Sequence, residues 1–260
     1  MKISILTFIF FLSIFCICEC TEMSNEEMSD VLKSKSLTYG SSLRFQNVLT
    51  EYYMTSFNMN WSTGSKLQVI TAIRSDSDSD SLFLIKEADG YFPRSTGTPV
   101  KCGDMIRLEH VNTGKNLHSH ELPSFVTNSQ EACAFGENGV GDVNDNIIIQ
   151  CYKQKDGEII KGDSQFFFKH NATQKYAYIN YKTSMFNDRN CRGCPIRGQR
   201  EVSFTEKKDK QCLWRMNGGL LFEENKGEED NNNSNNNNSN NNSSSNNENK
   251  KNKKENNYDL

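Results

Sequence analysis

Two histidines in this sequence have a spacing that could support chemistry. His118 and His120 are two residues apart, so on a strand their imidazoles would share one face and could begin a metal site. A metal site needs a third ligand, and the neighbouring sequence offers none, so we expect local hydrogen bonds or partner contacts and no metal. No Ser/His/Asp order and no carboxylate pair indicates a catalytic centre. We therefore expect a protein that is not an enzyme and needs no cofactor.

The first twenty residues have the layout of a cleavable secretory signal. Lys2 is followed by an apolar run over 3–18, and small side chains stand at Cys18 and Cys20. A membrane anchor needs roughly 20 apolar residues, and this run is shorter. We expect a signal peptide at 1–20 and no membrane span after its removal.

The secretory compartment changes how the cysteines are interpreted. Six remain after signal removal, an even number that favours disulfides, namely Cys102, Cys133, Cys151, Cys191, Cys194 and Cys212. Redox Cys-x-x-Cys pairs begin a helix, which lowers the thiol pKa. Cys191 and Cys194 instead lie in an Asn- and Arg-rich loop, which predicts a structural disulfide with each other, with Cys133 or with Cys212. Two glycosylation sequons begin at Asn60 and Asn171.

The C-terminal end has a different composition from the rest of the chain. Of the last 30 residues, 16 are Asn and 5 are Ser, so we expect 223–260 to be disordered. The final residues resemble an ER-retrieval signal only weakly. The net charge is −3 and no basic block falls in the remaining region, which argues against a nucleic-acid partner.

The elements that would position these residues form an internal repeat. Three segments align on a Thr that follows an Asn or His by three residues, at Asn47/Thr50, His110/Thr113 and His170/Thr173. A Gln-containing strand comes next in each segment, and a bulky residue then closes the unit. These positions are Gln68, Gln130 and Gln199 for the Gln, and Phe83, Ile147 and Trp214 for the bulky residue.

The repeat predicts an all-β fold. Apolar residues at i and i+2, separated by Gly-, Asn- and Ser-rich turns, are typical of short half-buried strands. Three units of about four strands each predict a β-trefoil, because no unit could bury its apolar face alone. A β-sandwich has no threefold repeat and ranks behind. We expect a lead-in at 21–36 and a trefoil at 37–222, with units at about 37–95, 96–155 and 156–222. Cys102 and Cys151 begin and end the second unit, so we expect them to be bridged.

The second unit resembles a known family. The segments 98–120 and 130–142 are similar to the central repeat of the stromal cell-derived factor 2 family, proteins of the secretory pathway built from three MIR motifs. Cys133 departs from that pattern, which usually has a hydroxyl residue there. Polar residues of the matching block are candidates for a partner or ligand surface, namely Arg107, His110, Asn116, His118 and His120.

The resemblance implies a non-catalytic protein of the ER lumen that acts in protein folding and quality control. Its partners would be a J-domain co-chaperone, the lumenal Hsp70 and unfolded client proteins. The alternatives are a lectin-like trefoil that binds glycans or an accessory factor of protein O-mannosylation. Glycan binding would need exposed aromatic side chains, for which Trp61, Tyr176 and Tyr178 are candidates.

Overall fold

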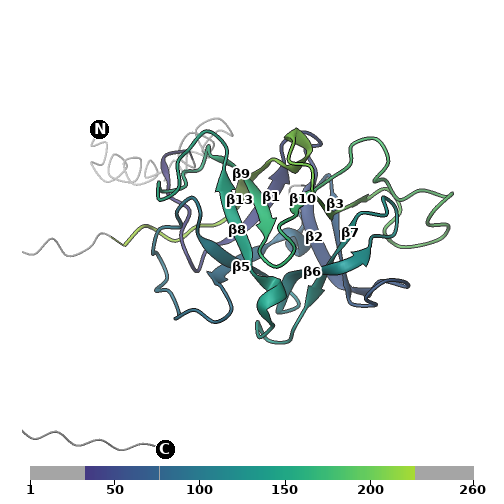
Figure 1. Cartoon of the computed structure of the whole chain (residues 1–260), viewed down its shortest axis with the longest axis horizontal. Helices are drawn as coiled ribbons and strands as arrows, with labels where there is room; N and C mark the ends of the chain where they lie inside the picture. Colours follow the sequence, from purple (N-terminus) through teal and green to yellow (C-terminus); the bar gives the residue numbers. More distant parts are fainter. Residues whose placement is uncertain (1–32, 76, 226–260) are drawn as a thin grey trace, which may run out of the picture. The chain divides into compact units, whose positions relative to one another are not determined.

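The structure is a computed structural model that describes residues 33–75 and 77–225. The expected signal peptide and nearly all of the expected tail lie outside the described residues. Within them the chain forms strands and short 3₁₀ helices (Figure 1). The strands are β1 (Ser42–Asn47), β2 (Tyr53–Asn60), β3 (Gln68–Ile73), β4 (Phe83–Glu87), β5 (Met105–His110), β6 (Lys115–Pro123), β7 (Gln130–Phe135), β8 (Ile147–Cys151), β9 (Gln165–His170), β10 (Tyr176–Tyr178), β11 (Arg200–Glu201), β12 (Ser203–Thr205) and β13 (Trp214–Leu220). The 3₁₀ helices are η2 (Ser79–Ser81), η3 (Val143–Asp145) and η4 (Lys210–Cys212).

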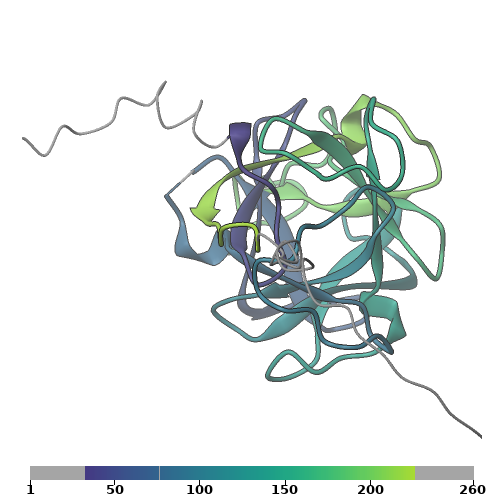
Figure 2. The same cartoon turned by 90° about the vertical axis from the view of Figure 1, so that its left-hand side faces the viewer.

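The strand pairing is that of a β-trefoil. Strands β1, β4, β5, β8, β9 and β13 pair in this order, and β13 returns to β1, so they close a barrel. The other strands form the hairpins β2–β3, β6–β7 and β10–β12. These hairpins pair with one another through β3–β7, β7–β12 and β11–β3 and cap one end of the barrel. Figure 2 shows the barrel after a quarter turn. The predicted fold class is confirmed.

The register confirms most of the repeat and corrects one position. Phe83, Ile147 and Trp214 pair with His110, His170 and Asn47, respectively, as three equivalent units require. The alignment of Gln199 with Gln68 and Gln130 was wrong by one residue. Gln68 pairs with Ala134 and Gln130 with Phe204, and the residue in the third equivalent pair, opposite Ala72, is Arg200. Its guanidinium lies 5.0 Å from the centre of the Tyr52 ring.

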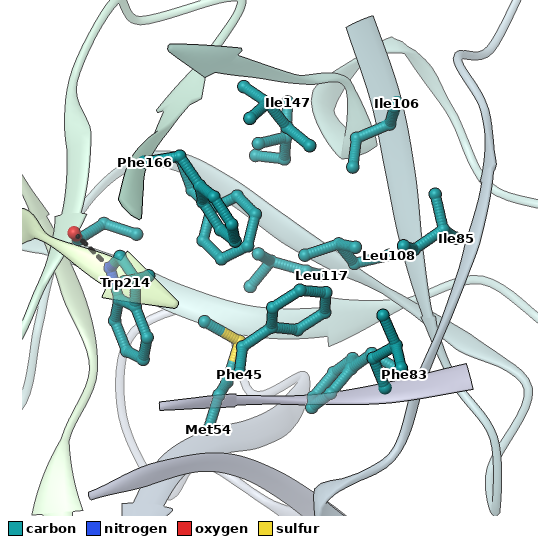
Figure 3. Packing of buried hydrophobic residues seen from close by; sticks show 14 of the residues in the cluster. Phe45, Met54, Phe83, Ile85, Ile106, Leu108, Leu117, Ile147, Phe166 and Trp214 are labelled. Atoms are coloured by element: carbon teal, nitrogen blue, oxygen red, sulfur yellow. Dashed lines mark hydrogen bonds between the residues drawn. The ribbon is translucent and has the colours of Figure 1, made fainter. Parts of the chain in front are cut away.

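The barrel interior is a single apolar core to which all three units contribute (Figure 3). Phe45 makes edge-to-face contacts with Phe166 and Phe168, with ring centroids 6.2 Å and 5.1 Å apart. The indole N–H of Trp214 donates to the carbonyl of Ala177 at 2.9 Å, so the one polar atom of that buried ring is satisfied. The alternating apolar residues that predicted the strands therefore face this core.

The starts of the three units meet in a ring of backbone hydrogen bonds. Leu37 N–H donates to Ile160, Ile160 N–H to Val100 and Val100 N–H to Leu37, at 2.8 to 3.1 Å. All three side chains are buried in the core. This ring joins the three units at their first residues.

Candidate binding site

The five polar residues expected to form a surface in the second unit are mostly buried, and that expectation was wrong. Arg107, His110, Asn116 and His118 are at most 8% exposed, and His120 is half-buried. The physical reason is that the four buried side chains hydrogen-bond to groups of the second unit and of the end of the first unit. They are part of the scaffold.

His110 holds the turn after β5 to the 3₁₀ helix before β4. Its Nδ1 accepts from the Thr113 hydroxyl at 2.8 Å, and its Nε2 donates to the Asp80 carbonyl at 2.9 Å. His170 and Asn47 make the equivalent pairs of bonds in the other units. Burial lowers the pKa of His110 and of His170, so both imidazoles are neutral in the folded protein.

Asp145 is the centre of a second buried network. It is fully buried, and its Oδ1 lies 2.8 Å from Nδ1 of His118. Its Oδ2 accepts from the Asn116 side chain at 3.2 Å and from the Asp142 backbone at 2.9 Å. Arg107 is engaged separately, because its Nε donates to a backbone carbonyl of β4 at 2.9 Å. This network anchors η3 to β6.

Two disulfides are present among the described residues, and one of them is the expected bridge of the second unit. Cys102 is joined to Cys151, and Cys191 to Cys194, which settles the alternatives left open for the Cys-x-x-Cys pair. Cys133 and Cys212 are buried free thiols. Burial raises the pKa of both, to about 11 for Cys212, so neither is a ready nucleophile.

An apolar hollow lies where loops from all three units converge over the cap. Its volume is about 140 Å³. Apolar cavities of about this size can hold a benzene ring, so the hollow suits one large apolar side chain. Its lining comes from the end of β2 and from the β2–β3, β6–β7 and β10–β11 loops, and comprises Met59, Asn60, Trp61, Ser62, Phe125, Phe186, Cys191, Cys194 and Ile196. Phe125 is 40% exposed.

Aromatic contacts join the three loops. The Phe186 ring lies 6.0 Å from Trp61 and 6.3 Å from Phe125, and the second pair is stacked. A hydrogen bond to β7 fixes Trp61, because its indole N–H donates to the Ala132 carbonyl at 3.1 Å. The hollow therefore has a fixed aromatic wall.

Glu201 fixes the loop that carries Phe125. Its carboxylate accepts from the backbone N–H of Val126 at 2.6 Å and of Thr127 at 2.9 Å, and from the Ser124 hydroxyl at 3.1 Å. These donors flank Phe125 on both sides. Hydrogen bonds to a buried carboxylate are strong, so Phe125 sits on a rigid loop.

Glu131 plays the same role for the first loop, and the third loop has no such carboxylate. Glu131 accepts from the hydroxyl and the backbone N–H of Ser65, and burial raises its pKa. The register makes Val69 the equivalent of Glu131 and Glu201. Val69 packs in the apolar cluster beneath the third loop, which the Cys191–Cys194 disulfide closes.

The aromatic side chains that were candidates for glycan binding are largely buried. Trp61 and Tyr178 are each 6% exposed, so neither can offer a ring face to a sugar, and Tyr176 is half-buried. Of the two sequon asparagines, Asn60 is exposed at the rim of the hollow and Asn171 is half-buried in a turn.

Sequence reasoning missed Phe125, Glu131 and Glu201. The signal for Phe125 was a bulky apolar residue inside a turn-rich segment, where a solvated loop would carry polar residues. Each of the two glutamates precedes a small or apolar residue, Ala132 or Val202, and a buried glutamate is unusual unless it has partners. These residues could have indicated loops that are fixed by buried contacts.

Comparison with known proteins decides the family. The model of the MIR domain matches residues 63–221. A "stromal cell-derived factor 2-like protein" of Dictyostelium discoideum is 33% identical over 222 residues, which are 83% of this chain and 98% of that protein. The chain belongs to the stromal cell-derived factor 2 family. The human stromal cell-derived factor 2 is 32% identical over 193 residues, covering 73% of this chain and 84% of that protein.

A solved structure of a family member has the same fold. The crystal structure of the stromal cell-derived factor 2-like protein from Arabidopsis thaliana matches with a TM-score of 0.66 and 26% identity. It covers 74% of this chain and 99% of that one. The stromal cell-derived factor 2 resemblance of the second unit thus extends over the whole trefoil. In 33–75 and 77–225 no helix is long and apolar enough to cross a membrane.

Proposed function

We propose that this protein of the stromal cell-derived factor 2 family works in the ER lumen as a non-catalytic accessory of protein folding and quality control. It acts with a J-domain co-chaperone and the lumenal Hsp70 on unfolded clients. Within this complex the hollow over the cap holds an apolar side chain of the client. The observation that carries the proposal is the apolar hollow with Phe125, which is 40% exposed, in its lining.

The chemistry of the hollow favours an unfolded chain over a small polar ligand. Its wall is formed by rings, methionine, isoleucine and a disulfide, and Asn60 and Ser62 supply its polar side chains. Unfolded proteins expose apolar side chains of many shapes, and a binder for them needs apolar area with little directional demand. Met59 adds an adaptable side chain to the rigid aromatic wall.

The hydrogen bonds of the histidines support a non-catalytic role. His110 and His170 are tied to a threonine and a backbone carbonyl, and His118 is tied to Asp145. An imidazole that acts as a general base must be free to reach a substrate. Three of the four histidines in the sequence are therefore used for structure.

The predicted signal at 1–20 supports entry into the secretory pathway, and we propose that a partner retains the protein there. A lumenal partner with its own retrieval signal would hold the complex in the ER. If removing the J-domain partner caused no additional secretion of this protein, that route of retention would be excluded.

The experiment is affinity purification of the endogenous protein from a secretory-compartment lysate, followed by mass spectrometry. We expect a lumenal J-domain protein and Hsp70 in near-stoichiometric amounts. If neither is recovered while the bait is intact and folded, the proposal fails, and glycan arrays become the next test. A Phe125→Ala bait should keep the J-domain protein and lose clients, which separates the two contacts.

A further inference from the structure

Two imidazoles and a thiol lie together in the second unit. His118 of β6 is directly opposite Cys133 of β7, and His120 lies two residues further along the same face. One ligand atom from each of the three residues lies within 4.8 Å of the other two. The two imidazole rings are 5.3 Å apart and inclined at 62°. Sequence alone paired the histidines but missed the thiol, which comes from the neighbouring strand.

Asp145 determines which nitrogen of His118 is available. The buried carboxylate lies 2.8 Å from Nδ1, so Nδ1 carries the proton that it donates, and a metal ion would bind through Nε2. A carboxylate that holds the second nitrogen of an imidazole is the usual support of a metal-binding histidine. Asp142 adds a second carboxylate oxygen 3.6 Å from the same Nδ1.

The other two units provide an internal control, because they have the same backbone without these ligands. The register makes Thr55 and Tyr178 the equivalents of His118, and Thr71 and Ser203 the equivalents of Cys133. By the same count His120 corresponds to Phe57 and Asn180. The fold therefore does not require a His/His/Cys group at this place.

The second buried thiol gives a further contrast. Cys212 lies in an apolar cluster with Phe167, Tyr178 and Leu213. Among the described residues, no group of three potential metal ligands includes Cys212, whereas Cys133 belongs to one. Of the two free thiols in the described residues, Cys133 is thus the one with nitrogen ligands beside it.

We propose that His118, His120 and Cys133 bind one Zn²⁺ ion, with the fourth position open to water or to a ligand atom. Imidazole nitrogen and thiolate sulfur are the donors that Zn²⁺ prefers, and three protein ligands leave a tetrahedral ion one free position. On binding, the S–H bond of Cys133 breaks and an S–Zn bond forms. The proton goes to solvent and no electron is transferred. The proposal revises the sequence-based expectation of no metal and is independent of the proposed function.

Titration of the full mature protein with Co²⁺, with both disulfides intact, tests the site. Co²⁺ in place of Zn²⁺ should give a thiolate-to-metal absorption band, and added Zn²⁺ should abolish it. Cys133→Ser should remove the band, and His120→Asn should weaken binding at least tenfold. Both changes introduce the residue that the third unit has at that position, so the fold should tolerate them. Cys212→Ser is the matched control and should bind like the parent.

X-ray absorption of the Zn²⁺-loaded parent protein tests the ligands without any variant. We expect one sulfur at about 2.3 Å and nitrogen ligands at about 2.0 Å. A shell without sulfur, or with two sulfurs from an opened Cys191–Cys194 pair, would overturn the proposal. So would a Co²⁺ band that is missing from the parent, survives Cys133→Ser or disappears in Cys212→Ser.

Discussion

The barrel end and the cap end of this trefoil use the same threefold repeat in opposite ways. Where the units begin, Leu37, Val100 and Ile160 occupy equivalent places and make equivalent bonds. Over the cap, the equivalent positions hold Val69, Glu131 and Glu201, so a carboxylate fixes two of the loops and a disulfide closes the third. Positions that recur in all three units therefore determine the fold, and positions at which the units differ form the candidate sites.

The largest expected effect concerns the two disulfides, one in each region. In the chain-entropy model, the Cys102–Cys151 bridge, with a sequence separation of 49, should contribute about 4 kcal/mol to the free energy of unfolding. The Cys191–Cys194 bridge, with a separation of 3, should contribute roughly 2 kcal/mol or less. Urea unfolding of the two double Cys→Ser variants measures both values. A larger loss from the cap bridge would reverse the comparison.

The next effect concerns the repeated hydrogen-bond position. His170→Ala removes two hydrogen bonds and leaves a cavity beside Phe204, so we expect a loss of about 3 kcal/mol. His170→Asn installs the residue that the first unit uses at the same place and should cost less than about half of that. Equal losses from the two variants would show that the three positions are not interchangeable. Chemical denaturation at pH 7.5 is the measurement.

The histidines at this repeated position should make the stability of the protein depend on pH. Burial lowers the pKa of His110 and of His170 from the ordinary 6.5, so the unfolded chain binds protons that the folded protein does not. Stability should be fully present above about pH 6.5 and should fall as the pH drops below it. The double variant His110→Asn/His170→Asn should show a smaller fall between pH 7.5 and 5.5. An unchanged slope in the double variant would exclude these two groups as the cause.

The smallest effect on stability is expected in the cap. Phe125 is 40% exposed, so Phe125→Ala should cost less than about 1 kcal/mol. The same change should lower the ability of the protein to suppress aggregation of a reduced client several-fold. Phe92→Ala is the control, because Phe92 is 92% exposed and lies in another loop. Light scattering during client aggregation distinguishes the two variants.

Sequence alone predicted the fold because the barrel depends on local alternation and on positions that recur, such as Asn47, His110 and His170. It did not predict the arrangement of the loops over the cap, because these loops depend on contacts between units. Glu201 and the Phe125 loop are an example of such a contact, far apart in sequence. The misplaced Gln199 has the same origin, because the longer third loop shifted the apparent repeat by one residue. Burial of the second-unit polar residues was missed because residue type alone does not show which polar groups find partners inside.

The most direct test of the proposed function is photo-crosslinking from the cap to an unfolded client. A benzophenone side chain would replace Phe125 in one variant and Phe92 in another, each mixed with the same reduced client. We predict more client adduct from position 125, although Phe92 is the more exposed of the two rings. Equal or greater adduct from position 92 would mean that exposed apolar surface, and not the hollow, attracts the client, and would contradict the account.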